Sequence, residues 1–209
     1  CLDIGLSTGG FAQVLLERGA AHVTGIDVGQ GQVDPTLATH PRLTAIEGLN
    51  ARELTAAHLS HRPVEFVTSD VSFISLTLAL PPALDLAEPG AKAVLLVKPQ
   101  FEAGREAIGK GGLLKDPSMA ESVAARLRDW LDEQAGWRAT DLAPSPIEGG
   151  DEAARVDRLL TDQLREHTDI VGIYSLGGGN RGLRDALDRA GADPRPMVVV
   201  HELTDQSRV

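Results

Sequence analysis

The sequence predicts an α/β protein built around a mostly parallel, doubly wound sheet. Two observations lead to this fold class. Short apolar segments alternate along the chain with longer segments in which apolar residues recur at helical spacing. The chain has 209 residues, which is enough for one α/β domain with its own hydrophobic core.

The strands of the first part are expected where apolar residues are bounded by glycine, proline or polar residues. The strongest is AKAVLLVKPQF, which we expect to be a buried strand. The intervening helices are amphipathic, and the helix at 75–90 contains prolines that favour a turn or a kink. The expected strands are 1–5, 22–28, 43–47, 64–73, 91–101 and 137–147, and the expected helices are 10–20, 51–59, 75–90 and 119–136.

A second unit is expected over residues 151–209. It begins with a helix at 151–167, which is followed by a βαβ unit with strands at 169–175 and 195–203 around a helix at 177–191. This unit is too short to close a core of its own. We therefore expect it either to extend the first sheet or to be a fragment of a larger domain.

The charge and the cysteine content restrict the possible functions. The net charge is −10, and it is negative in both parts of the chain, so bulk charge does not indicate a nucleic-acid-binding protein. The single cysteine, Cys1, excludes an internal disulfide and favours a cytoplasmic protein. No apolar run is long enough to span a bilayer, and no His/Cys cluster indicates a metal. Because the first residues are already strand-like, we expect the chain to be truncated at its N-terminus.

Polar residues or glycines follow four successive strands. In open α/β sheets, ligands bind at the carboxyl ends of the strands, near the point where the strand order reverses. An acidic residue after the second strand is suited to accept hydrogen bonds from both hydroxyls of a ribose. The four strand ends together predict a crevice shaped for a nucleoside. The residues concerned are Asp3, Gly5, Ser7, Gly9 and Gly10 at the first strand, then Asp27, Asn50 and Asp70.

Each of these residues also has a purely structural interpretation. Asp27 and Asn50 are residue types that cap helices and turns. For either residue taken alone, capping and ligand binding are therefore about equally favoured interpretations. Lys98 ends the expected strand at 91–101, where it lies beside Asp70. An Asp–Lys pair there is suited to orient or activate a hydroxyl, whereas the alternative is a lysine that extends to water.

Several motifs in the first part resemble those of the TlyA/hemolysin A-type family of rRNA 2′-O-methyltransferases. In chain order they are LDIGLSTGGF, GIDVGQGQVDP, IEGLNARELT, SDVSFISL, LLVKPQFEAGREAIGKGG and KDP. The resemblance covers about residues 1–147. It implies an FtsJ-like, Rossmann-like methyltransferase domain that binds S-adenosylmethionine and methylates a ribose 2′-hydroxyl of rRNA cytidines.

The resemblance also implies roles for individual residues. Gly5, Ser7, Gly9 and Gly10 would cradle the methionine end of the cofactor. Asp27 would bind its ribose, and Asn50 would lie near the adenine. Asp70 and Lys98 match two members of a Lys-Asp-Lys-Glu catalytic set, and Lys98 would favour the developing alkoxide. No metal is implied.

The chain departs from this family in three respects. Family members normally carry an N-terminal S4-type RNA-binding domain, through which they would contact ribosomal RNA, and we expect this chain to lack it. We expect the first catalytic lysine of the family to lie upstream of residue 1. The final glutamate has no counterpart, because PSPIEGGDEAARVD leaves the pattern near Glu148. We therefore expect cofactor binding with weak or absent rRNA methylation.

The second part has a resemblance of its own. Residues 151–208 are similar to a stretch of the sugar-binding domain of LacI-type transcription regulators, in which Asn180 would lie near a ligand or cap a helix. On this interpretation the chain joins two unrelated pieces near 145–155. The alternatives to an rRNA methyltransferase are therefore a sugar-sensing module or an inactive chimera. A membrane-active hemolysin is a third class that no segment supports. The sequence does not determine the oligomeric state.

Overall fold

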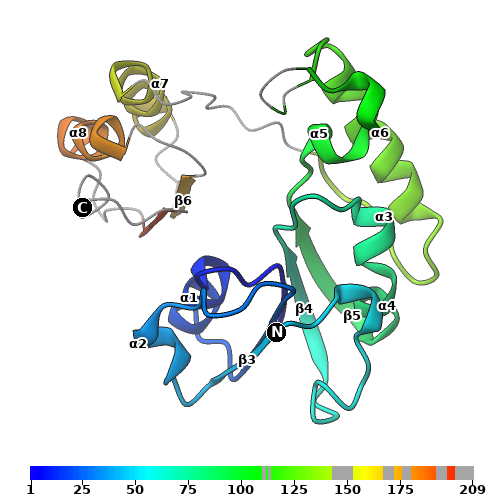
Figure 1. The fold of residues 1–209 in the computed structure, drawn as a ribbon. Coiled ribbons are helices and arrows are strands. Elements are labelled where there is room, and N and C mark those ends of the chain that lie inside the picture. The colour runs from blue at the N-terminus through cyan, green and yellow to red at the C-terminus, as the bar shows by residue number, and fades with distance from the viewer. Residues whose placement is uncertain are drawn as a thin grey trace. The chain divides into compact units, whose positions relative to one another are not determined.

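The chain forms two compact units, Cys1–Leu142 and Ala143–Val209, in a computed structural model (Figure 1). The residues that the structure describes are 1–109, 112, 114–142, 153–166, 172–175, 180–191 and 197–200.

The first unit is built on a five-stranded sheet in which every neighbouring pair of strands is parallel. The strand order is β3-β2-β1-β4-β5, so the chain moves outward in one direction from β1 and then returns to add β4 and β5 on the other side. This arrangement confirms the predicted doubly wound α/β fold. The strands are β1 (Leu2–Ile4), β2 (Val23–Asp27), β3 (Leu43–Glu47), β4 (Val64–Ser69) and β5 (Ala87–Leu95).

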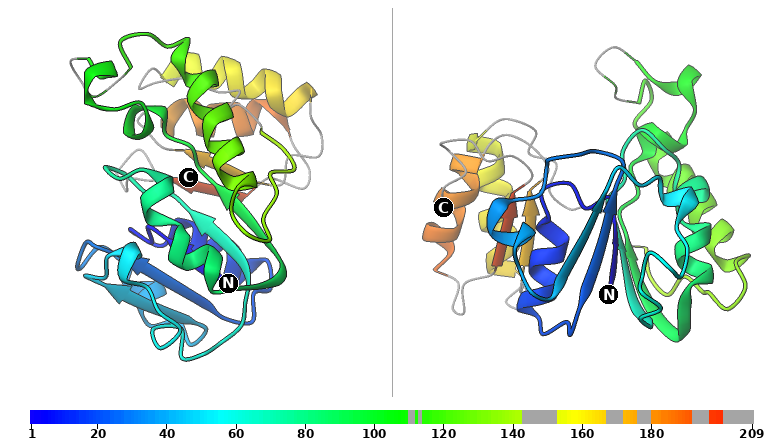
Figure 2. Two further views of the ribbon diagram at one scale, coloured as in Figure 1. Left: turned by 90° about the vertical axis from the view of Figure 1, so that its right-hand side faces the viewer. Right: turned by 60° about the horizontal axis from the view of Figure 1, so that its bottom comes forward.

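Helices cover both faces of this sheet. Figure 2 shows α1 on one side of the strands, whereas α3, α4 and α6 lie on the other. Prolines or side-chain caps begin several of the short helices, as at α2, where Asp34 caps the helix and Pro35 is its first residue. The helices are α1 (Gly10–Glu17), α2 (Pro35–Ala38), α3 (Leu76–Ala79), α4 (Pro81–Asp85), α5 (Pro99–Glu102) and α6 (Met119–Asp132), with 3₁₀ turns η1 (Ala51–Glu53) and η2 (Arg105–Ala107).

Alternating side chains of β1 divide the core between the two faces. Leu2 and Ile4 belong to the cluster that contains Val123 and Leu127 of α6. A second cluster packs on the other face, with Ala12 and Leu16 of α1 at its centre. Because β1 is buried on both faces, the residue between Leu2 and Ile4 is also removed from water, although it is the acidic Asp3.

Several predicted elements differ from the structure. The helix expected at 75–90 is two short helices, α3 and α4, and its last residues, from Ala87 onward, belong to β5. The helix expected at 51–59 is only the single turn η1, followed by hydrogen-bonded turns. Residues 137–142 of the strand expected at 137–147 form no strand, and its remainder lies outside the described residues. The strand expected at 91–101 is β5, which begins earlier and ends before Lys98. Because β5 is at the edge of the sheet, it is partly exposed rather than buried, and Val94 is 48% exposed.

The second unit confirms the predicted order of elements. It contains α7 (Ala153–Glu166), β6 (Gly172–Ser175), α8 (Asn180–Ala190) and β7 (Met197–Val200). The two strands are parallel, and the two helices pack through leucines such as Leu160, Leu164 and Leu183. The expected domain boundary, between 147 and 151, lies outside the described residues.

Candidate functional site

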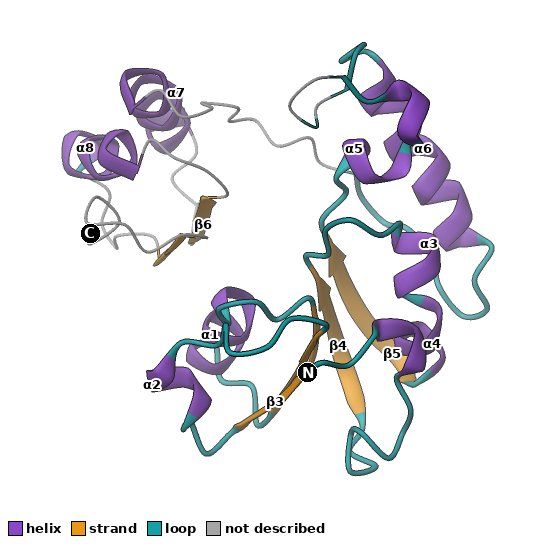
Figure 3. Ribbon diagram, viewed as in Figure 1, coloured by secondary structure: helices purple, strands orange, loops and turns teal. Residues whose placement is uncertain are grey.

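The predicted site residues cluster at one edge of the sheet in the first unit. Because all five strands are parallel, their carboxyl ends lie along the same edge (Figure 3). β1 lies between β2 and β4, and Asp3 is in register with Gly25 on one side and Thr68 on the other. The turn after β1 is therefore flanked by Asp27, which ends β2, and by Asp70, which follows β4.

The turn between β1 and α1 requires glycine at Gly5. Its φ is +89°, and a Cβ there would lie 2.7 Å from the backbone carbonyl oxygen of Asp70. The turn is also bonded to β2, because Gly5 N and Leu6 N both donate to the carbonyl oxygen of Ile26. Gly9 has a φ of 100° and precedes α1, whose first turn carries no side-chain cap. The backbone of this turn is thus closely packed against β2 and against the backbone of Asp70.

Asp27 organises the same turn from β2. Its Oδ2 accepts a 2.8 Å hydrogen bond from the backbone N–H of Ser7, and its Oδ1 accepts a 2.7 Å bond from that of Gly29. Ser7 itself has a positive φ of 47°. Each carboxylate oxygen has about two lone pairs, so both retain an acceptor position. The structural and the ligand-binding interpretations of Asp27 are therefore compatible.

Asn50 has the capping role that its residue type predicts. It precedes η1, and its Oδ1 accepts hydrogen bonds from the backbone N–H of Arg52 at 3.1 Å and from the Arg52 Nε at 3.3 Å. A contribution of Asn50 to ligand binding stays a prediction.

Asp3 lies within β1 and is buried beneath the turn. Its side chain is 1% exposed, Thr68 Oγ1 donates to its Oδ1 at 2.9 Å, and Oδ2 has no partner among the described residues. Burial raises the pKa of the Asp3 carboxyl to about 7, opposed by the hydrogen bond from Thr68 and assisted by the nearby Asp70 carboxylate. Asp3 therefore places a proton-binding group within the cluster of acidic residues.

Asp70 and Lys98 form a buried ion pair at the ends of β4 and β5. The Lys98 Nζ lies 2.5 Å from Asp70 Oδ1, and the two side chains are 13% and 5% exposed. The same ammonium donates to Ser72 Oγ at 2.9 Å. Two contacts therefore fix the position of this cation. The structure brings together Asp70 and Lys98 as the sequence predicts, and Gly5 lies against the Asp70 backbone.

Comparison with known proteins identifies the family. A profile of FtsJ-like methyltransferases matches residues 1–156.

The chain belongs to the FtsJ-like methyltransferase family.

Relatives and solved structures agree with this assignment. The chain is 43% identical over 191 residues to the 16S/23S rRNA (cytidine-2′-O)-methyltransferase TlyA of Mycobacterium tuberculosis, which covers 91% of this chain and 66% of that protein. It is 43% identical over 151 residues to the 23S rRNA (cytidine-2′-O)-methyltransferase TlyA of Campylobacter jejuni, covering 71% and 56%. A crystal structure of a Lactococcus lactis protein assigned as a hemolysin is 40% identical, with a TM-score of 0.59 over 62% of each chain. This chain thus spans about two thirds or less of these relatives.

The expected resemblance to LacI-type regulators lacks support. Because the alignment with the Mycobacterium protein covers 91% of the chain, it includes most of residues 151–208. The hypothesis that residues 151–208 are an unrelated piece is therefore not supported. Asn180 is the first residue of α8.

The FtsJ-like domain contains further residues at this edge to which the sequence analysis assigned no role. Phe73 is 91% exposed, has a φ of 66°, and contacts Phe101 with the ring centroids 5.0 Å apart. Glu102 accepts hydrogen bonds from the Ser75 hydroxyl and the Leu76 N–H. One signal was available in the sequence. The chain contains only four phenylalanines, and two of them lie in the motifs that carry Asp70 and Lys98.

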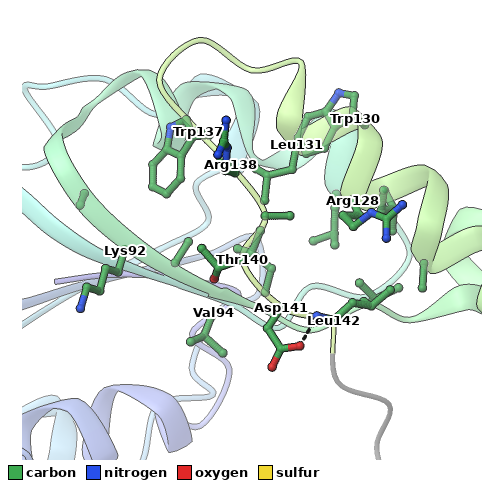
Figure 4. A pocket seen from close by; sticks show the side chains of 18 of the residues that line it. Lys92, Val94, Arg128, Trp130, Leu131, Trp137, Arg138, Thr140, Asp141 and Leu142 are labelled. Atoms are coloured by element: carbon green, nitrogen blue, oxygen red, sulfur yellow. Dashed lines mark hydrogen bonds between the residues drawn. The ribbon is translucent and has the colours of Figure 1, made fainter.

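A separate cavity of about 650 Å³ lies beside β5 and α6 of the FtsJ-like domain (Figure 4). Val94 of β5, Trp130 of α6 and Trp137 are among its lining residues, whereas Asp27, Asp70 and Lys98 are not. The predicted site is thus not this cavity.

No helix in the described part of the chain is long and apolar enough to cross a membrane. No group of three or more His, Cys, Asp or Glu side chains in the same residues is arranged to hold a metal ion.

Proposed function

We propose that this chain binds S-adenosylmethionine beside the turn after β1 and that the complete protein methylates a ribose 2′-hydroxyl of rRNA cytidines. The FtsJ-like family match and the names of the Mycobacterium and Campylobacter relatives support the reaction class. The observation that carries the proposal is the buried Asp70–Lys98 pair, which lies against the glycine turn.

The residues beside the turn fit such a cofactor. Gly5 has no room for a side chain because the Asp70 backbone lies against it, so the turn after β1 is held directly beside the segment that carries Asp70. Asp27 keeps one acceptor position on each oxygen for the two ribose hydroxyls. When bound, the cofactor supplies an electrophilic methyl group on a sulfonium centre.

Lys98 is the residue that we assign to the target hydroxyl. A fixed ammonium group stabilises negative charge that develops on an oxygen, and it acts most strongly where water is excluded. Asp70 and Ser72 hold the Lys98 Nζ in place, so little reorganisation is needed during the reaction. The main contribution of Lys98, held in this way, is to orient and stabilise the attacking oxygen.

Phe73 supports a single-stranded nucleic acid as the target. Sequence-specific recognition of RNA commonly stacks an unpaired base on an aromatic side chain, and each such contact contributes about 1–3 kcal/mol. An exposed phenylalanine within the segment that links Asp70 to α3 offers such a surface. Because the chain carries a net charge of −10, RNA affinity is not expected from bulk charge.

Calorimetric titration with S-adenosylmethionine tests cofactor binding. We expect the chain to bind it, and we expect Asp27→Ala to weaken binding by about 1.5–3 kcal/mol because hydrogen bonds to a charged group are lost. Thr36→Ala, which removes an exposed hydroxyl at α2, is the control. Equal affinity for the parent chain and Asp27→Ala would show that the ribose is not bound at β2.

Transfer of a labelled methyl group to ribosomal subunits tests the reaction. The complete protein is expected to methylate the subunits, and Lys98→Met is expected to lower turnover by about 100-fold. This chain alone is expected to bind cofactor with weak or absent transfer. Undiminished turnover in Lys98→Met would remove Lys98 from the mechanism.

A further inference from the structure

Two short segments at the site edge are joined by side-chain contacts at three places. They are residues 71–75, which follow β4, and residues 98–102, which follow β5. Lys98 contacts Ser72, Phe101 contacts Phe73, and Glu102 contacts Ser75. The order of contacts is the same in both segments, so they lie side by side in the same direction.

Glu102 makes the shortest of these contacts. Its Oε2 accepts a 2.5 Å hydrogen bond from the Ser75 hydroxyl, and its Oε1 accepts a 2.7 Å bond from the backbone N–H of Leu76, the first residue of α3. Its own carbonyl oxygen accepts a 2.9 Å bond from Arg126 of α6. α6 is anchored in the core by Val123 and Leu127. Glu102 therefore connects a well-packed helix to the end of the segment 71–75.

The segment 71–75 is held in an unfavourable conformation. Phe73 has a positive φ, which is rare and energetically unfavourable for a bulky side chain. Its ring is nevertheless almost fully exposed, so burial does not compensate for this cost. Such a conformation persists only where the surrounding contacts determine it, and the contacts at the end of this segment come from Glu102.

We propose that Glu102 is a positioning residue that holds the segment 71–75 against α5, and thereby fixes Phe73 and Ser72 beside Lys98. Glu102 acts through Ser75 and Leu76 and does not itself contact the reacting groups. Its significance for methyl transfer rests on the proposed function, whereas its effect on Phe73 does not.

Fluorine NMR of protein labelled with 4-fluorophenylalanine tests the effect on Phe73 directly. The chain has four phenylalanines and therefore four expected signals, of which Phe73→Leu and Phe101→Leu identify two. We expect Glu102→Ala to shift the signals of Phe73 and Phe101 towards the free amino acid value, while the signals of Phe11 and Phe66 stay in place.

Two variants separate positioning from a general loss of stability. Glu102→Gln keeps the length of the side chain and an acceptor for Leu76 N–H, and its amide donates to Ser75 Oγ, so the parent spectrum should return. Asp34→Ala removes the hydrogen bonds that cap another four-residue helix, α2, and should leave the Phe73 and Phe101 signals in place. If Glu102→Ala does not fold, Ser75→Ala removes one of the two bonds, together with the hydrogen bond from Thr77 N that caps α3, and should shift the same pair of signals.

The proposal is wrong if Phe73 and Phe101 keep their signals in folded Glu102→Ala, or if Glu102→Gln shifts them equally. Function is measured separately. In the complete protein, Glu102→Ala should lower turnover by about 100-fold through misplacement of the segment, with unchanged cofactor affinity. A parent chain that does not bind S-adenosylmethionine contradicts the proposed function, and the NMR comparison still decides the role of Glu102.

Discussion

The two halves of the candidate site are constructed differently. The cofactor half, residues 5–10 with Asp27, is held by hydrogen bonds to the backbone, as where Asp27 accepts from Ser7 N and Gly29 N. The transfer half, residues 70–75 with 98–102, is held by side chains that contact side chains across two separate segments.

This difference indicates where each half is sensitive to substitution. Backbone hydrogen bonds depend on the path of the chain, and glycine or aspartate in the turn determines that path. Side-chain pairs depend on both partners being present, and a buried charge that loses its partner is costly. Single side-chain substitutions should therefore damage the transfer half more than the cofactor half.

The largest expected effect is on the buried pair of the transfer half. Lys98→Met leaves the Asp70 carboxylate buried without its counter-ion, and we expect the free energy of unfolding to fall by about 3–5 kcal/mol. The double variant Asp70→Asn/Lys98→Met removes both charges and should recover much of this loss. Urea unfolding of the parent, both single variants and the double variant measures the coupling. Additive losses would show that the pair is not coupled.

The next effect concerns Asp3, which lies between the halves. Its pKa rises from 3.8 in the unfolded chain to about 7 in the folded protein. At intermediate pH the folded state therefore holds a proton on Asp3 that the unfolded state has released. Proton binding to Asp3 stabilises the folded state fully below pH 3.8, and this stabilisation is lost as the pH rises through 7. The difference corresponds to about 4 kcal/mol.

Asp3→Asn is expected to remove this dependence on pH and to be more stable than the parent at pH 8. Denaturant unfolding at several pH values from 4 to 8 measures the slope. Asp34→Asn is the control, because hydrogen bonds from Thr36 hold the pKa of the Asp34 carboxyl below its ordinary value. The stabilisation that the Asp34 carboxylate provides is lost only as the pH falls. Asp34→Asn should therefore keep the parent's change of unfolding free energy with pH near neutrality. If Asp3→Asn keeps the pH dependence of the parent's free energy of unfolding, that dependence comes from another titrating group.

The smallest effect tests the contact between the two halves. Gly5 and Gly19 have nearly equal φ values, +89° and +92°, but only at Gly5 would a Cβ meet neighbouring atoms. Both alanine variants carry the same backbone strain, so we expect Gly5→Ala to cost about 1–3 kcal/mol more than Gly19→Ala because of overpacking against Asp70. Thermal or urea unfolding measures the difference. Equal losses would mean that the Asp70 backbone moves aside without cost.

The sequence was sufficient to predict that residues 5–10 and Asp27 come together, because the signals are local. Strand alternation places the polar strand ends at one side of the sheet, and binding of a cofactor there stays a prediction. Asp27 and Gly5 are where this argument expects them. The burial of Asp3 was not foreseen, because it depends on α1 packing over β1.

The transfer half was predicted only in part. Asp70 and Lys98 were assigned from strand ends and family motifs, and they are paired. The contacts of Glu102 with Ser75 and Leu76 join residues 26 or more positions apart, and no spacing rule predicts them. The exposed ring of Phe73 was missed for the same reason, since apolar residues are usually assigned to the core. The apolar composition of β5 predicts a buried strand, because composition does not reveal that the strand lies at the edge of the sheet.

The parallel sheet also has an opposite edge, where helices return to the beginnings of strands. The connections at 18–22, 39–42 and 54–63 lie there, away from every residue assigned to binding or transfer (Figure 3). Among them, Ser60 and His61 form an exposed turn just before β4, with φ values of 50° and 53°. Surface turns of this kind are preferred sites for insertions. A fluorophore, an affinity peptide or a crystallisation partner is best attached at this turn, because it reports on or captures the protein without obstructing what binds at the other end of the strands.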